Sequence, residues 1–241
     1  MHQKLLRQAG LLAVVLLTTG FVLTGCIDEP NPPVLDRITS EIRFIHASPD
    51  APSVDVYVDE IKVVSSVGYK GFSNYLEVKS GNRFLRLVPA GGDTSQAVFR
   101  RQVSVRSFTK ITMAFHGSAT DVQLLATQER FTYADETSKL VDSCDVKLIN
   151  INSGGDAVKL AVKEGETGAR DIIPSVNMAS LSSYRRVLSE SNEYYLINAN
   201  NQRVVTIPFE FKKPGYRYSV LFIGTSLSRE ALVLQDEPYQ K

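Results

Sequence analysis

The sequence predicts an all-β protein of two tandem β-sandwich domains, which follow a signal sequence and a proline-rich tether. Short segments of alternating apolar and polar residues recur from residue 42 onward. Gly, Pro, Asn and Asp separate these segments, and no stretch has the periodicity of an amphipathic helix. The pattern of the first half then repeats in the second half. We therefore expect each domain to be an Ig-like or transthyretin-like antiparallel sandwich.

The amino terminus has the order of segments found in bacterial lipoprotein signals. Lys4 and Arg7 form a positive segment, and a mostly apolar run covers residues 11–23. That run is shorter than the roughly 20 apolar residues of a membrane-spanning helix. It ends in Leu-Thr-Gly-Cys, which resembles the lipobox, where a peptidase cleaves before the cysteine. The resemblance implies removal of residues 1–25 and acylation of Cys26; the alternative is an ordinary secretory signal with an incidental cysteine.

Acylation of Cys26 would set the location of the protein. Each buried acyl CH₂ contributes about 0.8 kcal/mol, so two or three chains hold a protein on a membrane almost irreversibly. We expect an outer-membrane anchor followed by a stiff tether, because three prolines lie within residues 26–39. The two acids after Ile27 resemble signals that send lipoproteins to the cell surface, although acids are also common in linkers.

Composition excludes several classes of protein. The chain has 241 residues, of which 43% are hydrophobic and 22% charged, as in a globular protein. Its formal charge of +1 becomes −1 once Lys4 and Arg7 are removed, so a nucleic-acid partner is not expected. Acylation of Cys26 leaves only Cys144, which then has no partner for an internal disulfide. We expect Cys144 to be a partly buried thiol in the linker between the domains.

The internal repeat sets the expected domain boundaries. With an offset of 104, residues 42–46 align with 146–150, and 54–58 align with 158–162. The offset later drifts to 109 and 107, as loop insertions would produce. The expected segments are a removed signal (1–25), an acylated tether (26–39), domain one (40–133), a linker (134–144) and domain two (145–241).

The first half also carries a family resemblance. Residues 46–59 read His-Ala-Ser-Pro-Asp-Ala-Pro-Ser-Val-Asp-Val-Tyr-Val-Asp, and Pro89-Ala90-Gly91 ends a later strand. This stretch resembles the bacterial domain-of-unknown-function 4397 family. The resemblance implies a β-sandwich on a secreted or surface protein and implies no activity. Asp59-Glu60 replaces the usual Asp-Gly turn, and the second half lacks the hallmark.

Four residues of the hallmark form the candidate ligand-binding loop: His46, Ser48, Asp50 and Asp55. One interpretation is a hydrolase that uses His46 with Asp50 or Asp55. However, catalytic triads converge from separate segments of the chain. The structural interpretation is a crossover in which His46 caps a strand and Asp50 hydrogen-bonds the loop backbone.

We expect no metal and no cofactor. Carboxylates four residues apart on a strand, such as Asp55 and Asp59, are about 13 Å apart, too far to share one Ca²⁺. His46 and His116 would supply only two of the three or four ligands of a zinc site. A pH-sensitive contact between these two histidines is a further hypothesis.

Tyrosines and arginines in the second half offer a weaker signal. Tyr194-Tyr195 places one ring on each face of a strand, and Arg185-Arg186 likewise points to both faces, so neither pair forms a patch by itself. Tyr75 and Tyr184 recur in both halves and are expected to be core framework.

The function expected from the sequence is that of a non-enzymatic cell-envelope lipoprotein. It would be displayed at the outer membrane or cell surface as a binding, adhesion or scaffold module for an unknown protein or glycan. Alternatives are an accessory subunit of a surface complex, or a hydrolase using His46 and Asp50.

Overall fold

The computed structural model describes residues 38–130, 142–166, 168–190, 192–208, 211 and 213–236. These residues are almost entirely β-strand, and the only helical element among them is the short 3₁₀ helix η2 (Thr94–Gln96). Among the same residues no helix is long and apolar enough to cross a membrane. Cys26 and the tether lie outside the described residues.

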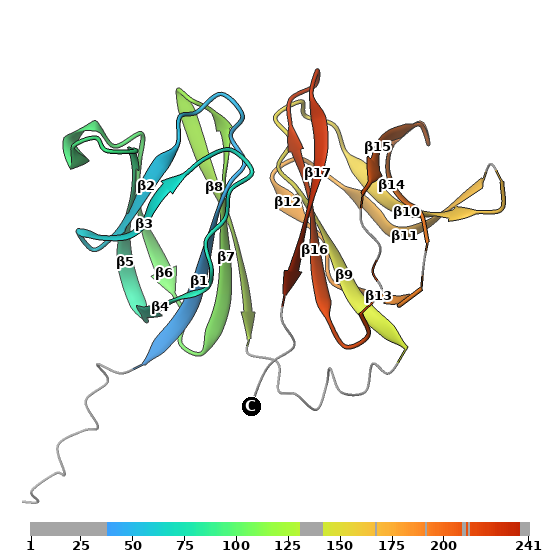
Figure 1. The fold of residues 1–241 in the computed structure, drawn as a ribbon, viewed down its shortest axis with the longest axis horizontal. Helices are drawn as coiled ribbons and strands as arrows, with labels where there is room; N and C mark the ends of the chain where they lie inside the picture. The colour runs from blue at the N-terminus through green and yellow to red at the C-terminus, as the bar shows by residue number, and fades with distance from the viewer. Residues whose placement is uncertain are drawn as a thin grey trace, which may run out of the picture. The chain divides into compact units, whose positions relative to one another are not determined.

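Eight strands of the first half form two four-stranded sheets (Figure 1). The strands are β1 (Thr39–His46), β2 (Val54–Val58), β3 (Ile61–Val67), β4 (Leu76–Lys79), β5 (Gly81–Pro89), β6 (Phe99–Val105), β7 (Thr109–Ser118) and β8 (Asp121–Arg130). One sheet has the order β4-β1-β7-β8 and the other the order β3-β2-β5-β6.

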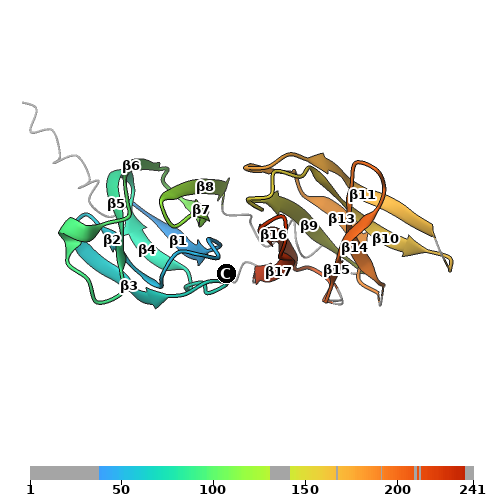
Figure 2. The ribbon, with the colours of Figure 1, turned by 90° about the horizontal axis from the view of Figure 1, so that it is seen from above.

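The second half repeats this arrangement with nine strands. They are β9 (Ser143–Asn150), β10 (Val158–Glu164), β11 (Gly168–Val176), β12 (Ser180–Leu181), β13 (Arg185–Leu188), β14 (Tyr194–Asn198), β15 (Arg203–Ile207), β16 (Arg217–Gly224) and β17 (Arg229–Asp236). The sheet orders are β12-β9-β16-β17, with β13 also paired to β9, and β11-β10-β14-β15. The two short strands β12 and β13 thus occupy the place of β4. Figure 2 shows these sheets from above.

The all-β sandwich fold predicted from the sequence is confirmed, and the strand order distinguishes the two named alternatives. Immunoglobulin domains place their first, second, fourth and fifth strands in one sheet. Here the first strand instead joins the fourth, seventh and eighth, which corresponds to the transthyretin-like alternative. The structure also departs from a purely antiparallel pattern, because β1 pairs with β7, and β9 with β16, in parallel.

The alternating pattern fills the core of each half. The three valines of β2 are buried between the two sheets of the first half, with Phe44 and Phe115 stacked beside them. The second core contains the corresponding residues of β10 and a tyrosine–phenylalanine cluster around Phe211. Side chains two residues apart share a face, so each strand turns its other face away from its own core.

Corresponding positions can be paired between the halves through strand register, and we call them matched positions. His46 lies opposite Phe115 in the β1–β7 pair, and Asn150 lies opposite Phe222 in the β9–β16 pair. His46 and Asn150 are therefore matched. The same strand order and register in both halves are what a duplication would produce.

A third apolar cluster joins the outer faces of the sheets that contain β1 and β9. Its members include Ile45 and Ala114 of the first half and Ile149, Leu221 and Ile223 of the second. Glu129 of β8 also forms an ion pair with Lys147 of β9. Residues 38–241 accordingly form one compact unit. Sheets nevertheless form within each half only, among the described residues, and the predicted domain boundaries stay predictions.

Cys144 lies in β9 rather than in a linker, which corrects the expectation from the sequence. Its side chain is completely buried in the second core, and burial raises the pKa of its thiol to about 11. It occupies the position matched to Ser40 of β1.

Candidate functional site

His46 is the last residue of β1 and is only 2% exposed. Its Nε2 donates to the carbonyl oxygen of Pro52 at 3.0 Å. At the matched position Asn150 donates to the carbonyl oxygen of Asp156 at 2.7 Å, six residues further along the chain in both cases. Two different side chains thus make the same hydrogen bond, and His46 holds the crossover after its strand.

Ser48 and Asp50 lie next along this crossover. The Ser48 hydroxyl donates to the carbonyl oxygen of Gly117 at 2.7 Å and lies 3.5 Å from the Asp50 carboxylate. Asp50 is exposed. Ser48 therefore ties the crossover to the end of β7, while Asp50 faces solvent. Whether this loop binds a ligand stays a prediction.

Asp55 of β2 is 2% exposed and its two carboxylate oxygens are used within the fold. They accept hydrogen bonds from Lys62 Nζ at 2.7 Å, from the Ser66 amide at 2.8 Å and from the Gly91 amide at 3.3 Å. The bond from Lys62 is the largest of the effects that lower the pKa of Asp55, and the Ser66 amide adds to it. Asp55 is a charged brace between the edge strand β3 and the loop after β5.

The matched pair in the second half carries the opposite charges. Lys159 takes the place of Asp55, and Asp171 takes the place of Lys62, with 2.9 Å between Nζ and the carboxylate. An ion pair is thus kept while its polarity is reversed. The brace itself therefore does not depend on which strand carries the carboxylate.

His116 lies on the opposite face of its sheet from His46. His46 pairs with Phe115 and points into the first core, so the next residue of β7 points outward. Burial lowers the pKa of His116, which is 3% exposed. The hypothesis of a contact between the two histidines is therefore wrong. No group of three or more His, Cys, Asp or Glu side chains suitable for a metal occurs among the described residues.

Tyr75 and Tyr184 lie outside the apolar cores, contrary to the expectation from the sequence. The Tyr75 ring contacts Arg43 and Lys110, with 4.7 and 4.9 Å between the cationic groups and the ring centroid. The Tyr184 ring has the same arrangement with Lys147 and Arg217, at 4.9 and 4.8 Å. The recurring tyrosines are framework residues that work through cation–π contacts.

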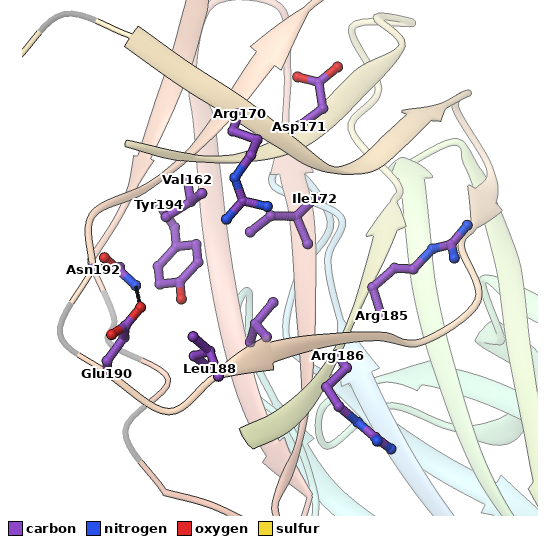
Figure 3. Close-up of a pocket in the computed structure, with 11 residues that line it drawn as sticks. Val162, Arg170, Asp171, Ile172, Arg185, Arg186, Leu188, Glu190, Asn192 and Tyr194 are labelled. Atoms are coloured by element: carbon purple, nitrogen blue, oxygen red, sulfur yellow. Dashed lines mark hydrogen bonds between the residues drawn. The ribbon is translucent and has the colours of Figure 1, made fainter. Parts of the chain in front are cut away.

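A cavity of about 370 Å³ opens at the edge of the second sandwich, between β11 and β13 (Figure 3). Its apolar and aromatic lining residues come from both sheets: Val162, Ile172, Val187, Leu188 and Tyr194. Polar and charged side chains surround this floor: Arg170, Asp171, Arg185, Arg186, Glu190 and Asn192. An apolar floor with a few polar groups is the usual composition of a small-ligand site.

Tyr194 supplies the polar end of the floor. The residue is 1% exposed, and its ring packs against Phe211 with 4.6 Å between centroids. Burial raises the pKa of Tyr194, while a hydrogen bond with the Asn192 side chain and the charge of Arg170 act in the opposite direction. Asn192 also donates to Glu190 at 3.0 Å. The hydroxyl is therefore part of a short polar chain at one end of the cavity.

Arg170 is the arginine that lies over this polar end. Figure 3 shows its guanidinium extending toward Tyr194, whereas Arg185 and Arg186 line the cavity with their stems and point their charged ends away. Arg170 forms an ion pair with Glu164 at 3.9 Å, and both side chains are 65% exposed. Exposed pairs of this kind interact weakly, so the Arg170 guanidinium is available to a ligand.

At the corresponding edge of the first half, different residues occupy the matched positions. Leu85 lies where Tyr194 lies, and Ile61 lies where Arg170 lies. Five residues separate Lys79 from Leu85 and the matched Leu188 from Tyr194, but in the first half four of the five already belong to β5. The second half is longer instead in the hairpin before Arg170, where residues 163–169 replace Asp59 and Glu60.

The hallmark residues of the first half lie within a match to a known protein family. The model of the family described as "Domain of unknown function (DUF4397)" matches residues 40–161. The chain belongs to the DUF4397 family. The match covers half of the chain and extends past the predicted boundary at residue 133, through β9 and into β10. In this DUF4397 chain the hallmark residues thus hold the first sandwich together through backbone carbonyls and amides.

Comparison with other proteins adds little beyond the family. No curated protein matches the chain. One solved structure, the CBM26 module of Eubacterium rectale Amy13K in complex with maltoheptaose, matches with 12% identity and a TM-score of 0.26, covering 83% of this chain and 98% of that chain. A candidate cell adhesion protein from Bacteroides uniformis matches with 10% identity and a TM-score of 0.26, covering 85% and 99%. Neither similarity carries an argument about function.

Sequence reasoning missed the cavity of the DUF4397 chain. It placed Arg185-Arg186 and Tyr194-Tyr195 on strands, where neighbours face opposite sides, and found no patch. The signal that could have located the site is the insertion before Arg170, where residues 163–169 stand in place of residues 59–60 of the first repeat. An insertion in one copy is a place to look for function, because loops often carry binding residues.

Proposed function

We propose that this DUF4397 protein is a lipid-anchored, non-enzymatic binding protein of the bacterial cell envelope. Cys26 would carry the acyl chains at the outer membrane, and the proline-rich segment up to residue 39 would hold the two sandwiches away from the bilayer. The lipobox in the sequence supports the anchor. Surface display and the identity of the partner belong to the same proposal.

The observation that carries the binding role is the cavity of the second half. Both halves use one strand order, yet only the second replaces apolar matched residues by Arg170 and Tyr194 and lengthens the hairpin that leads into Arg170. The packing of the two sheets accounts for the strand order that both halves share. Packing does not account for the charged Arg170 beside the buried hydroxyl of Tyr194, so we assign this cavity to ligand binding.

The hydrolase alternative is less well supported, because His46 and Asp55, two of the three residues it named, are engaged within the fold. His46 Nε2 is bonded to the carbonyl oxygen of Pro52, and Asn150 makes the same bond in the second half. Asp55 is engaged by Lys62 and two backbone amides. Both side chains perform structural tasks that account for their burial.

Anchoring is tested by comparing the wild-type chain with Cys26→Ala in a Gram-negative host. The wild-type protein should incorporate a labelled fatty acid and sediment with outer membranes. Cys26→Ala should lose the label and remain in the soluble fraction. An unlabelled wild-type protein, or a Cys26→Ala protein that still sediments with membranes, would contradict the anchor.

Binding through the cavity is tested with Leu188→Trp, which adds bulk at the mouth. Leu188 is 54% exposed, so the substitution should leave the melting temperature nearly unchanged. Leu227→Trp is the matched control, because Leu227 is almost fully exposed in the turn between β16 and β17. On an array of envelope and host glycans, Leu188→Trp should lose binding that wild type and Leu227→Trp share. Equal binding by all three proteins would exclude the cavity.

A further inference from the structure

The rim of the cavity has a charge that the first half lacks. Arg170, Arg185 and Arg186 occupy the positions matched to Ile61, Leu76 and Glu77. Three positions that together carry one negative charge in the first half therefore carry three positive charges in the second. Framework packing does not require this change, because the same strands pair in the same register in both halves.

Acids near the rim cancel only part of this charge. Asp171 is engaged by Lys159 at 2.9 Å, and Arg186 lies 3.5 Å from Asp145. The remaining acid of the cavity, Glu190, accepts a hydrogen bond from Asn192. Arg170 lies 3.9 Å from Glu164 in an exposed and therefore weak pair, and it is the arginine whose guanidinium extends over the cavity. Arg170 is thus the group at the mouth of the cavity that favours an anion.

The floor points to a ligand that also carries hydroxyl groups. Tyr194 lines this cavity together with Asn192, whose amide donates to the Glu190 carboxylate at 3.0 Å, so donors and acceptors gather there. Ile172 and Leu188 provide an apolar wall on which the C–H face of a sugar ring packs. A volume of about 370 Å³ is at the lower end of the range of small-molecule sites. These features fit one or two sugar rings.

We infer that the cavity binds a carboxylate-bearing sugar unit, such as a uronic or sialic acid at the end of a glycan. Arg170 would hold the carboxylate, since a guanidinium presents a planar fork that matches a carboxylate with two parallel hydrogen bonds. Tyr194 and its neighbours would bind ring hydroxyls. This inference rests on the proposed binding function and specifies its ligand class.

An acidic peptide fits the site less well. A peptide carboxylate would also engage Arg170, but it brings no set of hydroxyls for the chain formed by Tyr194, Asn192 and Glu190. A free phosphate would leave the apolar wall of Ile172 and Leu188 uncovered. The combination of one cation, a hydroxyl-binding chain and an apolar wall therefore favours the acidic sugar.

The test uses the full chain carrying Cys26→Ala, probed on an array of uronic-acid and sialic-acid glycans, their neutral counterparts and acidic peptides. We expect at least one acidic glycan to bind about tenfold or more tightly than its neutral counterpart. Binding should weaken as salt rises, because the contact is charge-assisted at an exposed rim. Arg170→Gln should weaken it by about tenfold or more, and Tyr194→Phe by about threefold to tenfold.

The matched control is Arg101→Gln, which removes the same charge from an exposed strand position in the first half. It should leave glycan affinity unchanged, and circular dichroism should show that all three variants are folded. Equal affinity for neutral glycans would overturn the acidic-sugar assignment while keeping the proposed binding function. Preference for acidic peptides, an equal loss in Arg101→Gln, or no glycan bound would also overturn the assignment.

Discussion

The two halves of this protein differ most at the edge of the sandwich where β4 or β13 leads into the next strand. In the first half β5 begins one residue after β4, and Leu85 is buried. In the second half the same number of residues leads to the matched Tyr194, but β14 begins only there, and Tyr194 contacts Phe211 and lines a cavity. The difference shows that one framework can continue a strand in one copy and border a cavity in the other.

The two halves share one backbone conformation that favours glycine, at the turn after β7 and after β16. Gly117 and Gly224 occupy matched positions near the ends of β7 and β16, with φ of 96° and 95°. A Cβ atom would lie 2.4 Å from the Asp121 carbonyl oxygen in the first half and 1.9 Å from the Ser228 carbonyl oxygen in the second. Both glycines are needed because the following turn approaches the strand closely.

The largest effect is therefore expected from alanine at either of these glycines. Gly117→Ala and Gly224→Ala should each lower the free energy of unfolding by about 2–4 kcal/mol, since strain at positive φ adds to a steric clash. Urea unfolding measures the loss. Gly91→Ala is the control, because Gly91 has φ of 77° but open space around it, and it should lose only about 1 kcal/mol. A tolerated Gly224→Ala would break the equivalence of the two turns.

A smaller loss of stability should distinguish the ion pair of Asp55 with Lys62 from the reversed pair of Lys159 with Asp171. Asp55→Asn should cost about 1.5–3 kcal/mol, because a buried carboxylate with three donors is replaced by an amide that cannot accept all of them. Lys159→Gln should cost under about 1 kcal/mol, as for an exposed pair. Equal losses in urea unfolding would show that the two pairs are interchangeable.

The two ion pairs should also differ in how they make stability depend on pH. The folded pKa of Asp55 is lowered by its bonds to Lys62 and to backbone amides. Its stabilising contribution is therefore fully present above the ordinary carboxyl pKa of about 3.9 and is lost as the pH falls through the lower folded value. Asp55→Asn should make the free energy of unfolding depend less on pH in that acid range, as measured by urea unfolding at several pH values. Lys159→Gln should leave that pH dependence unchanged.

The smallest effect is expected at the apolar cluster that joins the halves. His116 occupies the place matched to Ile223, and burial lowers its pKa. The unfolded chain therefore binds a proton more readily, and the penalty grows as the pH falls below the ordinary histidine pKa of about 6.5. His116→Ile should change stability at pH 8 by at most about 1 kcal/mol.

The pH profile of the same variant is the sharper readout. His116→Ile should lessen the loss of stability between pH 7 and pH 5, measured by thermal melts across that range. An unchanged slope would mean that other histidines control the dependence. The hallmark histidine, His46, supplies the comparison through His46→Asn, which introduces the residue of the second half.

Strand positions could be predicted from the sequence because alternation is local. The three valines of β2 alternate with polar residues, and turn residues separate the segments, so the strands and the repeat offset followed from short windows of sequence. The parallel pairing of β1 with β7 was not predicted, because the local sequence of a strand does not show which distant strand pairs with it. The prediction that Cys144 lies in the linker was wrong for a related reason. In the sequence, the first residues of a buried strand look like the last residues of a linker.

The site was harder to predict than the fold. The hallmark drew attention to His46 and Asp55 because they are chemically capable residues in a distinctive motif, yet their hydrogen bonds serve the crossover and the brace. Arg170 and Tyr194 lie in separate strands and are brought together only by the register of β11 and β14 with β10. A motif scan finds neighbours in sequence, whereas this cavity is made of neighbours across a sheet.

The most direct test of the central claim maps where an acidic glycan touches the full chain. Amide hydrogen exchange with and without the bound glycan reports each strand separately. The account predicts added protection confined to β11, β13 and β14, with the matched strands β3, β4 and β5 unchanged. Protection in the first half, or around the loop from His46 to Asp55, would contradict the claim that only the second half carries the site.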